Sequence, residues 1–160
     1  MLLKTAKEVL TQHPDWIWKL IGDGEMKEEV LQFIKNEKLE GKFLLQPPVS
    51  SGINDEYANA SLFVLSSRYE AFPMVLLEAM SFGIPCISFD CPSGPADIIT
   101  DNNDGLLIEK GNTQKLAEAI SSLINNDEQR KKMGENALIS IRRFSPETIY
   151  QLWKEKIFTL

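Results

Sequence analysis

The chain has 160 residues, a length that suits one domain with its own core and is too short for two. Its 43% hydrophobic and 25% charged residues are typical of a globular domain, and a net charge of -6 argues against binding to nucleic acid through its phosphates. We expect no membrane span and no secretory signal, because no run approaches about 18 apolar residues. Cys86 and Cys91 form neither a zinc site nor a disulfide framework, so we expect an acidic, cytoplasmic protein.

Short apolar runs alternate with helical patterns along the chain. Near-continuous apolar runs of this length are typical of strands covered on both faces of a parallel sheet. We expect strands at 16–21, 42–45, 62–65, 84–89 and 105–108. We expect helices at 2–12, 25–36, 54–60, 74–82, 113–125, 128–143 and 146–158, the last with Ser145 as its N-cap, and a further short helix that opens near Gly94.

The alternation of strands and helices predicts an α/β fold, a Rossmann-like doubly wound parallel sheet with flanking helices. The chain opens on a helix, whereas the first strand of such a sheet usually lies at its centre. We therefore expect the first strand to be missing and residues 1–160 to be a fragment of a larger protein. The neighbours of the missing strand would then pair directly, or an intermolecular contact would close the sheet. The last two helices are expected to pack as an appendage across one face.

Ligands of open α/β sheets bind beyond the carboxyl ends of the strands, where two turns of this chain stand out. Gly22-Asp-Gly24-Glu25 follows the first predicted strand and leads into a helix. The simpler interpretation is a tight turn in which the glycines tolerate positive φ and Glu25 favours the helix N-terminus. The alternative is backbone left bare for a ligand. Gln46-Pro47-Pro48 follows the second strand as a stiff turn.

The segment from 65 to 83 carries the clearest chemistry. Pro73 fits the first position of a helix, so the amides of Met74 and Val75 would point out of its N-terminus and form a site for phosphate. The helix is apolar on almost every side, which predicts that it is buried. Glu78 is its one charged residue, and its two carboxylate oxygens suit the vicinal diol of a ribose. The alternative is that Glu78 lies on a thin solvated stripe with Ser81.

Glu70 lies eight residues before Glu78, and the segment Glu70-Ala-Phe-Pro-Met-Val-Leu-Leu-Glu78 resembles the E-x7-E motif of family-4 retaining glycosyltransferases with the GT-B fold. The flanks at 22–24, 79–85, 94–99 and 144–153 are similar to that family too. The resemblance covers essentially the whole chain. It implies the C-terminal, nucleotide-sugar-binding domain of an enzyme that transfers a hexosyl group to an acceptor hydroxyl with retention.

By that resemblance Glu78 holds the ribose hydroxyls, and Glu70 is the catalytic candidate that contacts the transferred sugar. Phe72, Pro73, Met74 and Val75 receive the diphosphate, Gln46 and Pro47 lie beside the base, and Gly22 and Gly24 complete the donor-binding set. No Asp-x-Asp pair occurs, so neither a metal nor another cofactor is expected. The implied partners are a nucleotide sugar and the enzyme's own N-terminal acceptor domain.

The sequence also departs from the family pattern. Residue 71 is Ala where the family usually has Gly, and the Arg and Lys that clamp the diphosphate follow the first strand, which is not present here. We therefore expect the chain alone to be inactive. Surface-polysaccharide enzymes are the nearest resemblance, with lipid-linked acceptors at the inner membrane face as one option. The alternative functions are a nucleotide-sugar-binding module without catalysis and an interaction domain of the same fold.

Overall fold

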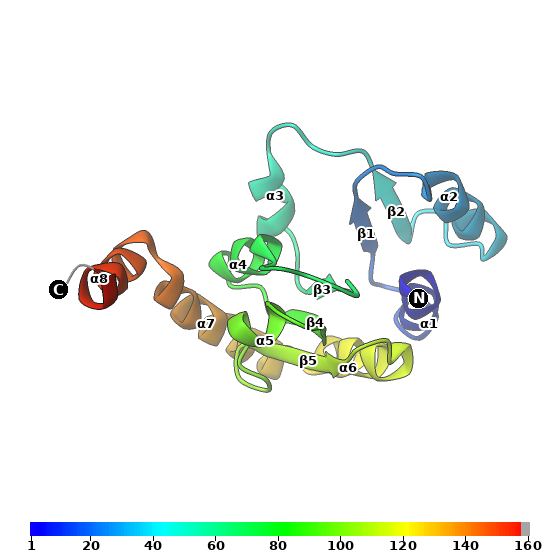
Figure 1. Cartoon of the computed structure of the whole chain (residues 1–160). Helices are drawn as coiled ribbons and strands as arrows, with labels where there is room; N and C mark the ends of the chain where they lie inside the picture. Colours follow the sequence, from blue (N-terminus) through cyan, green and yellow to red (C-terminus); the bar gives the residue numbers. More distant parts are fainter. Residues whose placement is uncertain (158–160) are drawn as a thin grey trace.

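The computed structural model describes residues 1–157 and contains the expected strands and helices, with ends shifted by a few residues (Figure 1). The strands are β1 (Trp18–Ile21), β2 (Phe43–Gln46), β3 (Phe63–Leu65), β4 (Cys86–Asp90) and β5 (Gly105–Glu109). The helices are α1 (Leu2–Gln12), α2 (Lys27–Asn36), α3 (Ile53–Ala58), α4 (Met74–Ser81), α5 (Pro95–Ile98), α6 (Thr113–Asn125), α7 (Asp127–Ser140), the 3-10 turn η1 (Ile141–Phe144) and α8 (Pro146–Ile157). Phe158, the predicted end of the last helix, lies outside the described residues.

The parallel sheet is divided into two pieces. β1 pairs with β2, and β3, β4 and β5 form a three-stranded sheet in that order, with all pairs parallel. β1 and β3 do not pair, so direct pairing of the neighbours of the missing strand, one of the two expected closures, is wrong. The division falls at the position where the central first strand was expected.

The core is built by alternation along the strands, because successive side chains of a strand point to opposite faces. Cys86 packs with α4, α5 and α7 on one face, whereas Ile87 and Phe89 pack with α1 and α6 on the other. A third cluster fills the space between α1, α2 and β2. Trp18 contacts both of the last two clusters, so α1 and β1 join the two pieces of the sheet.

The two C-terminal helices behave differently. α7 packs against α4 and buries Met133 and Ala137, and Gly134 approaches so closely that a Cβ there would lie 2.2 Å from the backbone oxygen of Gly83. The expectation of an appendage is therefore wrong for α7, which belongs to the core. α8 has no buried residue and lies at the far end of the molecule from β1 and β2 (Figure 1). Its predicted N-cap is present, since the Thr148 N–H donates to Ser145 Oγ at 3.2 Å.

Within residues 1–157, no helix combines the length and hydropathy that crossing a bilayer requires. In the same range, no cluster of three or more His, Cys, Asp or Glu side chains is arranged to hold a metal ion. Cys86 and Cys91 are both free and buried, as a structural thiol would be.

Candidate functional site

The N-terminus of α4 follows β3 through a loop that carries several of the predicted site residues. Pro73 is the N-cap, with φ -75° and ψ 90°, so it stands one position earlier than predicted. The Leu76 N–H donates to the Pro73 oxygen at 3.0 Å, whereas within residues 1–157 the amides of Met74 and Val75 have no acceptor. Two adjacent N–H groups at the positive end of a helix dipole form a geometry that binds anions.

The loop before α4 is held in place by α5 and η1. A Cβ on Gly94 would lie 2.5 Å from Pro73 Cδ and 3.3 Å from the Ala71 oxygen, so only glycine allows this approach. The Asp97 carboxylate accepts the Gly94 N–H at 3.2 Å, which is the expected capping contact. The Phe72 ring packs edge-on against Phe144 with centroids 5.9 Å apart. The start of α4 is therefore positioned by two elements later in the chain.

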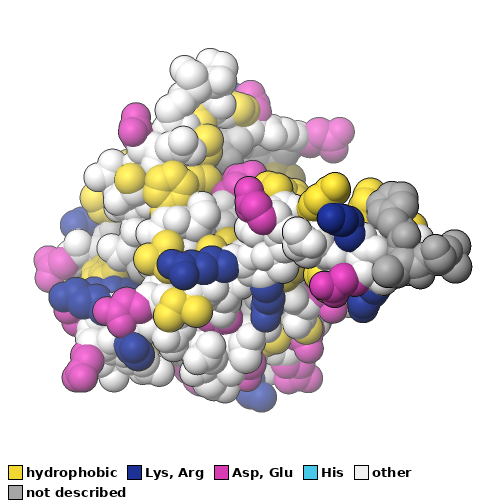
Figure 2. Space-filling view, turned by 90° about the vertical axis from the view of Figure 1, so that its left-hand side faces the viewer, with side chains coloured by type: hydrophobic (Ala, Val, Ile, Leu, Met, Phe, Trp, Pro, Cys, Tyr) yellow, Lys and Arg dark blue, Asp and Glu magenta, His cyan; other side chains and the backbone are white. Residues whose placement is uncertain are grey.

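α4 is buried on one side and open on the other. Leu76, Ala79 and Met80 are buried in the core, whereas Met74 is 56% exposed and Phe82, just after the helix, is 40% exposed. The prediction that the helix is buried all round is wrong, because only one side of it packs against the sheet and α7. Figure 2 faces the side of α3, α4 and α8 and shows hydrophobic side chains exposed beside acidic ones.

Glu78 lies on the open side of α4 with Ser81, as the alternative interpretation had it. Its carboxylate is nevertheless held, because the Tyr57 hydroxyl donates to Glu78 Oε2 at 2.8 Å. Tyr57 comes from α3, and its ring stacks on Phe82 with centroids 5.6 Å apart. Burial, with a further contribution from the bond to Glu78, raises the pKa of Tyr57, so the hydroxyl remains a donor at neutral pH. Sequence analysis did not identify Tyr57.

Glu70 lies in the loop between β3 and α4 and is partly exposed. Within the described part of the chain its carboxylate makes no hydrogen bond and no ion pair. The neighbouring Tyr69 is highly exposed, and the Lys110 ammonium group lies 3.8 Å from the centroid of its ring. Glu70 is therefore available to a ligand, with a cation from the end of β5 nearby.

The turns after β1 and β2 are brought together by the sheet. The Gly22 N–H donates to the Gln46 oxygen at 2.9 Å, and Pro47 follows directly. The Gly24 N–H donates to Asp23 Oδ1 at 2.9 Å, a self-contained turn that agrees with the simpler interpretation. No atom lies within 4 Å of a Cβ built on Gly22 or Gly24, so the backbone is also open on that side.

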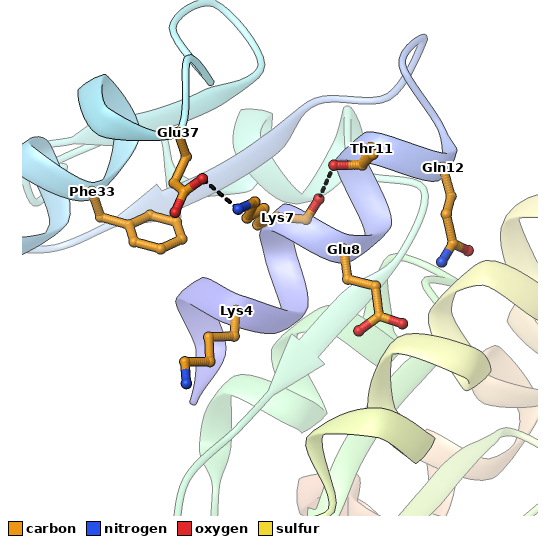
Figure 3. A pocket seen from close by; sticks show the side chains of 7 residues that line it. All are labelled: Lys4, Lys7, Glu8, Thr11, Gln12, Phe33 and Glu37. Carbon is orange, nitrogen blue, oxygen red and sulfur yellow. Dashed lines mark hydrogen bonds and ion pairs between the residues drawn. The ribbon is translucent and has the colours of Figure 1, made fainter.

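A short helix connects these turns to α4. Glu56 of α3 forms an ion pair with Lys19 of β1, and the next residue, Tyr57, holds Glu78 of α4. α3 thus joins the two pieces of the sheet on the side where the predicted residues lie. These residues line an open surface, and none of them lines the hollow of about 410 Å³ between α1 and α2. Figure 3 shows that this hollow is lined by charged and polar side chains, and the ion pair of Lys7 with Glu37 lies in it.

Comparisons with known proteins agree on one family. The sequence model of the family described as "Glycosyl transferases group 1" matches residues 1–139. The chain is 37% identical over 158 residues to an exopolysaccharide phosphotransferase of Streptomyces coelicolor, covering 98% of this chain and 17% of that protein. It is 36% identical over 140 residues to the amylovoran biosynthesis glycosyltransferase AmsD of Erwinia amylovora, covering 86% of this chain and 39% of AmsD.

Among solved structures, the chain is similar to S. aureus TarM in complex with fondaparinux, alpha-GlcNAc-glycerol and UDP. The TM-score is 0.89 at 29% identity, and the match covers 96% of this chain and 31% of TarM. The chain therefore spans well under half the length of each of these proteins. Its α/β fold is that of the GT-B C-terminal domain.

Proposed function

The chain belongs to the group 1 family of glycosyl transferases, and we propose that residues 1–160 are the donor-binding domain of a family-4 retaining enzyme. The observation that carries the proposal is the pairing of two free amides, those of Met74 and Val75, with the held carboxylate of Glu78 one turn further along α4. A nucleoside diphosphate offers both an anion for the amides and a diol for the carboxylate.

We assign the residues to the parts of a nucleotide sugar. The diphosphate binds at Phe72, Pro73, Met74 and Val75, where the amides and the helix dipole stabilise the charge that grows as the glycosidic bond breaks. Glu78 binds the ribose and Glu70 contacts the transferred hexose, so Glu70 is the proposed catalytic residue. The turns with Gly22, Gly24, Gln46 and Pro47 receive the rest of the donor, the last two beside the base.

The whole enzyme needs more than this chain. TarM was solved with UDP, which supports a uridine nucleotide as the donor's leaving group here. The relatives are longer, and the gap between β1 and β3 has the parallel neighbours that one further strand requires. We propose that the remaining polypeptide supplies that strand, the basic residues after it and the acceptor domain. AmsD acts in amylovoran biosynthesis by its name, which supports a surface polysaccharide as product, made in the cytoplasm or at the inner membrane face on a lipid-linked acceptor.

The donor site can be tested by titrating UDP into the purified chain by calorimetry. We expect saturable binding that weakens roughly tenfold or more in Glu78→Gln, because a carboxylate accepts stronger hydrogen bonds than an amide. Glu118→Gln, an exposed acid on α6, serves as the matched control and should bind like the wild type. Absence of saturable binding of any nucleotide or nucleotide sugar would contradict the proposal and favour an interaction domain.

The catalytic assignment is tested in an enzyme that contains this domain and its acceptor half. Glu70→Ala and Glu78→Ala should each greatly reduce hexosyl transfer from a UDP-sugar, measured as UDP released. The purified chain of 160 residues should transfer no sugar by itself. Full turnover in both variants would show that the motif has been misassigned.

A further inference from the structure

We infer that Tyr57 is a positioning residue for the donor's ribose: its hydroxyl orients the Glu78 carboxylate so that the carboxylate discriminates a vicinal diol from a deoxyribose. This inference rests on the proposed function, which makes Glu78 the ribose-binding residue. It adds a residue of α3 that the E-x7-E motif does not contain.

The hydrogen-bond arithmetic allows both contacts. The bond of 2.8 Å from Tyr57 uses one lone pair of Oε2, and within residues 1–157 Oε1 has no partner. An ionised carboxylate has about four acceptor positions on its two oxygens. Each oxygen of Glu78 therefore still accepts a hydrogen bond from one hydroxyl of a diol while Tyr57 stays in place.

Tyr57 is rigid enough to orient another side chain. It is only 8% exposed. Its ring stacks on Phe82 at an interplanar angle of 24° and packs at a tilt against Phe63 with centroids 6.1 Å apart. The preceding residue, Glu56, is tied to Lys19 of β1, so α3 is fixed at both sides.

Glu78, in contrast, has little else to fix its carboxylate. It lies on the open side of α4, and the terminal torsion of a glutamate is broad and roughly two-fold. A carboxylate that rotates freely meets a diol with only a fraction of its orientations. The Tyr57 hydroxyl removes that freedom before the nucleotide binds, which is how a rigid partner raises affinity and selectivity.

The experiment compares UDP with 2′,3′-dideoxyuridine diphosphate by calorimetry in the full chain. Wild type should prefer UDP by about tenfold or more, since Glu78 binds the diol. Tyr57→Phe keeps the aromatic ring and removes only the hydroxyl. It should lose most of this preference through weaker UDP binding, while its affinity for the dideoxy nucleotide stays unchanged. Tyr150→Phe, at a 60% exposed tyrosine on α8, is the matched control and should keep the full preference.

A second variant separates orientation from folding. Phe82→Leu removes the stacking partner of Tyr57 at a residue that is 40% exposed, and it leaves the hydroxyl in place. We expect it to lower the preference for UDP by a smaller factor than Tyr57→Phe does. A merely structural role of Tyr57 would weaken both nucleotides equally.

The outcomes distinguish the two levels of the argument. If wild type binds no UDP, the proposed function fails and this inference fails with it. If wild type prefers UDP and Tyr57→Phe retains that preference, the inference alone is overturned. If Tyr57→Phe does not fold, an undiminished preference in Phe82→Leu overturns it as well.

Discussion

Gly94 is the single backbone position that most directly holds the start of α4. Its φ of 98° is a left-handed conformation, and a Cβ there would lie 2.5 Å from Pro73 Cδ. Gly94→Ala should lower the free energy of unfolding by about 2–4 kcal/mol, because backbone strain and a steric clash act together. Urea denaturation followed by circular dichroism measures this. Binding of UDP should weaken in parallel, because the loop before α4 must shift.

Gly41 offers a matched control for the strain alone. Its φ is 76°, but no atom lies within 4 Å of a Cβ built there. Gly41→Ala should therefore cost only about 1–2 kcal/mol and leave nucleotide binding unchanged. Equal losses of stability in the two variants would mean that the contact with Pro73 carries no energy.

Residue-level prediction from the sequence succeeds where the signal is local. Gly94 as the cap of a helix and Asp97 in its first turn follow from neighbouring residues, and the contact between them is present. The bond from Tyr57 to Glu78 joins residues 21 positions apart, and it exists only because α3 packs beside α4. No local pattern marks such a pair. A tyrosine in a short helix before the motif is the one signal that the sequence offers.

The helix α4 shows the same limit at the scale of an element. Its composition predicts burial on every side, yet only the side with Leu76 faces the core, and Met74 lies on the open side. Hydropathy counts apolar side chains, whereas burial depends on which neighbours are present. The helices and strands themselves are predicted well, because the periods of 2 and 3.6 residues are properties of the local chain.

Two substitutions on this one helix test its orientation. Leu76→Ala removes a side chain with no exposed surface and should lower the free energy of unfolding by about 2–5 kcal/mol. Met74→Ala acts on a side chain that is 56% exposed and should change it by less than about 1 kcal/mol. Thermal and urea denaturation of both variants provide the comparison. A large loss in Met74→Ala would mean that another part of the protein covers the open side.

At the scale of the whole molecule, the divided sheet governs what the chain can do. N–H groups alternate between the two sides of a strand, and the printed pattern of pairing fixes which side each one faces. The Trp18 N–H donates to Lys42 on the β2 side, so the Lys19 N–H faces the gap. The Phe63 N–H donates to Pro85 on the β4 side, so the Val64 N–H also faces the gap. One parallel strand between β1 and β3 would pair with both edges.

Amide hydrogen exchange measured by NMR tests this arrangement. Ile87 lies in β4, which is paired on both sides, so its amide should exchange slowly. Val64 and Lys19 should exchange at least about 100-fold faster in the isolated chain, because edge groups open to water are not protected. In a longer protein that supplies the missing strand, both amides should become as protected as Ile87. Protection of Val64 in the isolated chain that disappears on dilution would instead reveal an intermolecular contact closing the sheet. Protection that is independent of concentration would contradict an open gap, because it would require a pairing within the chain that β1 and β3 do not make here.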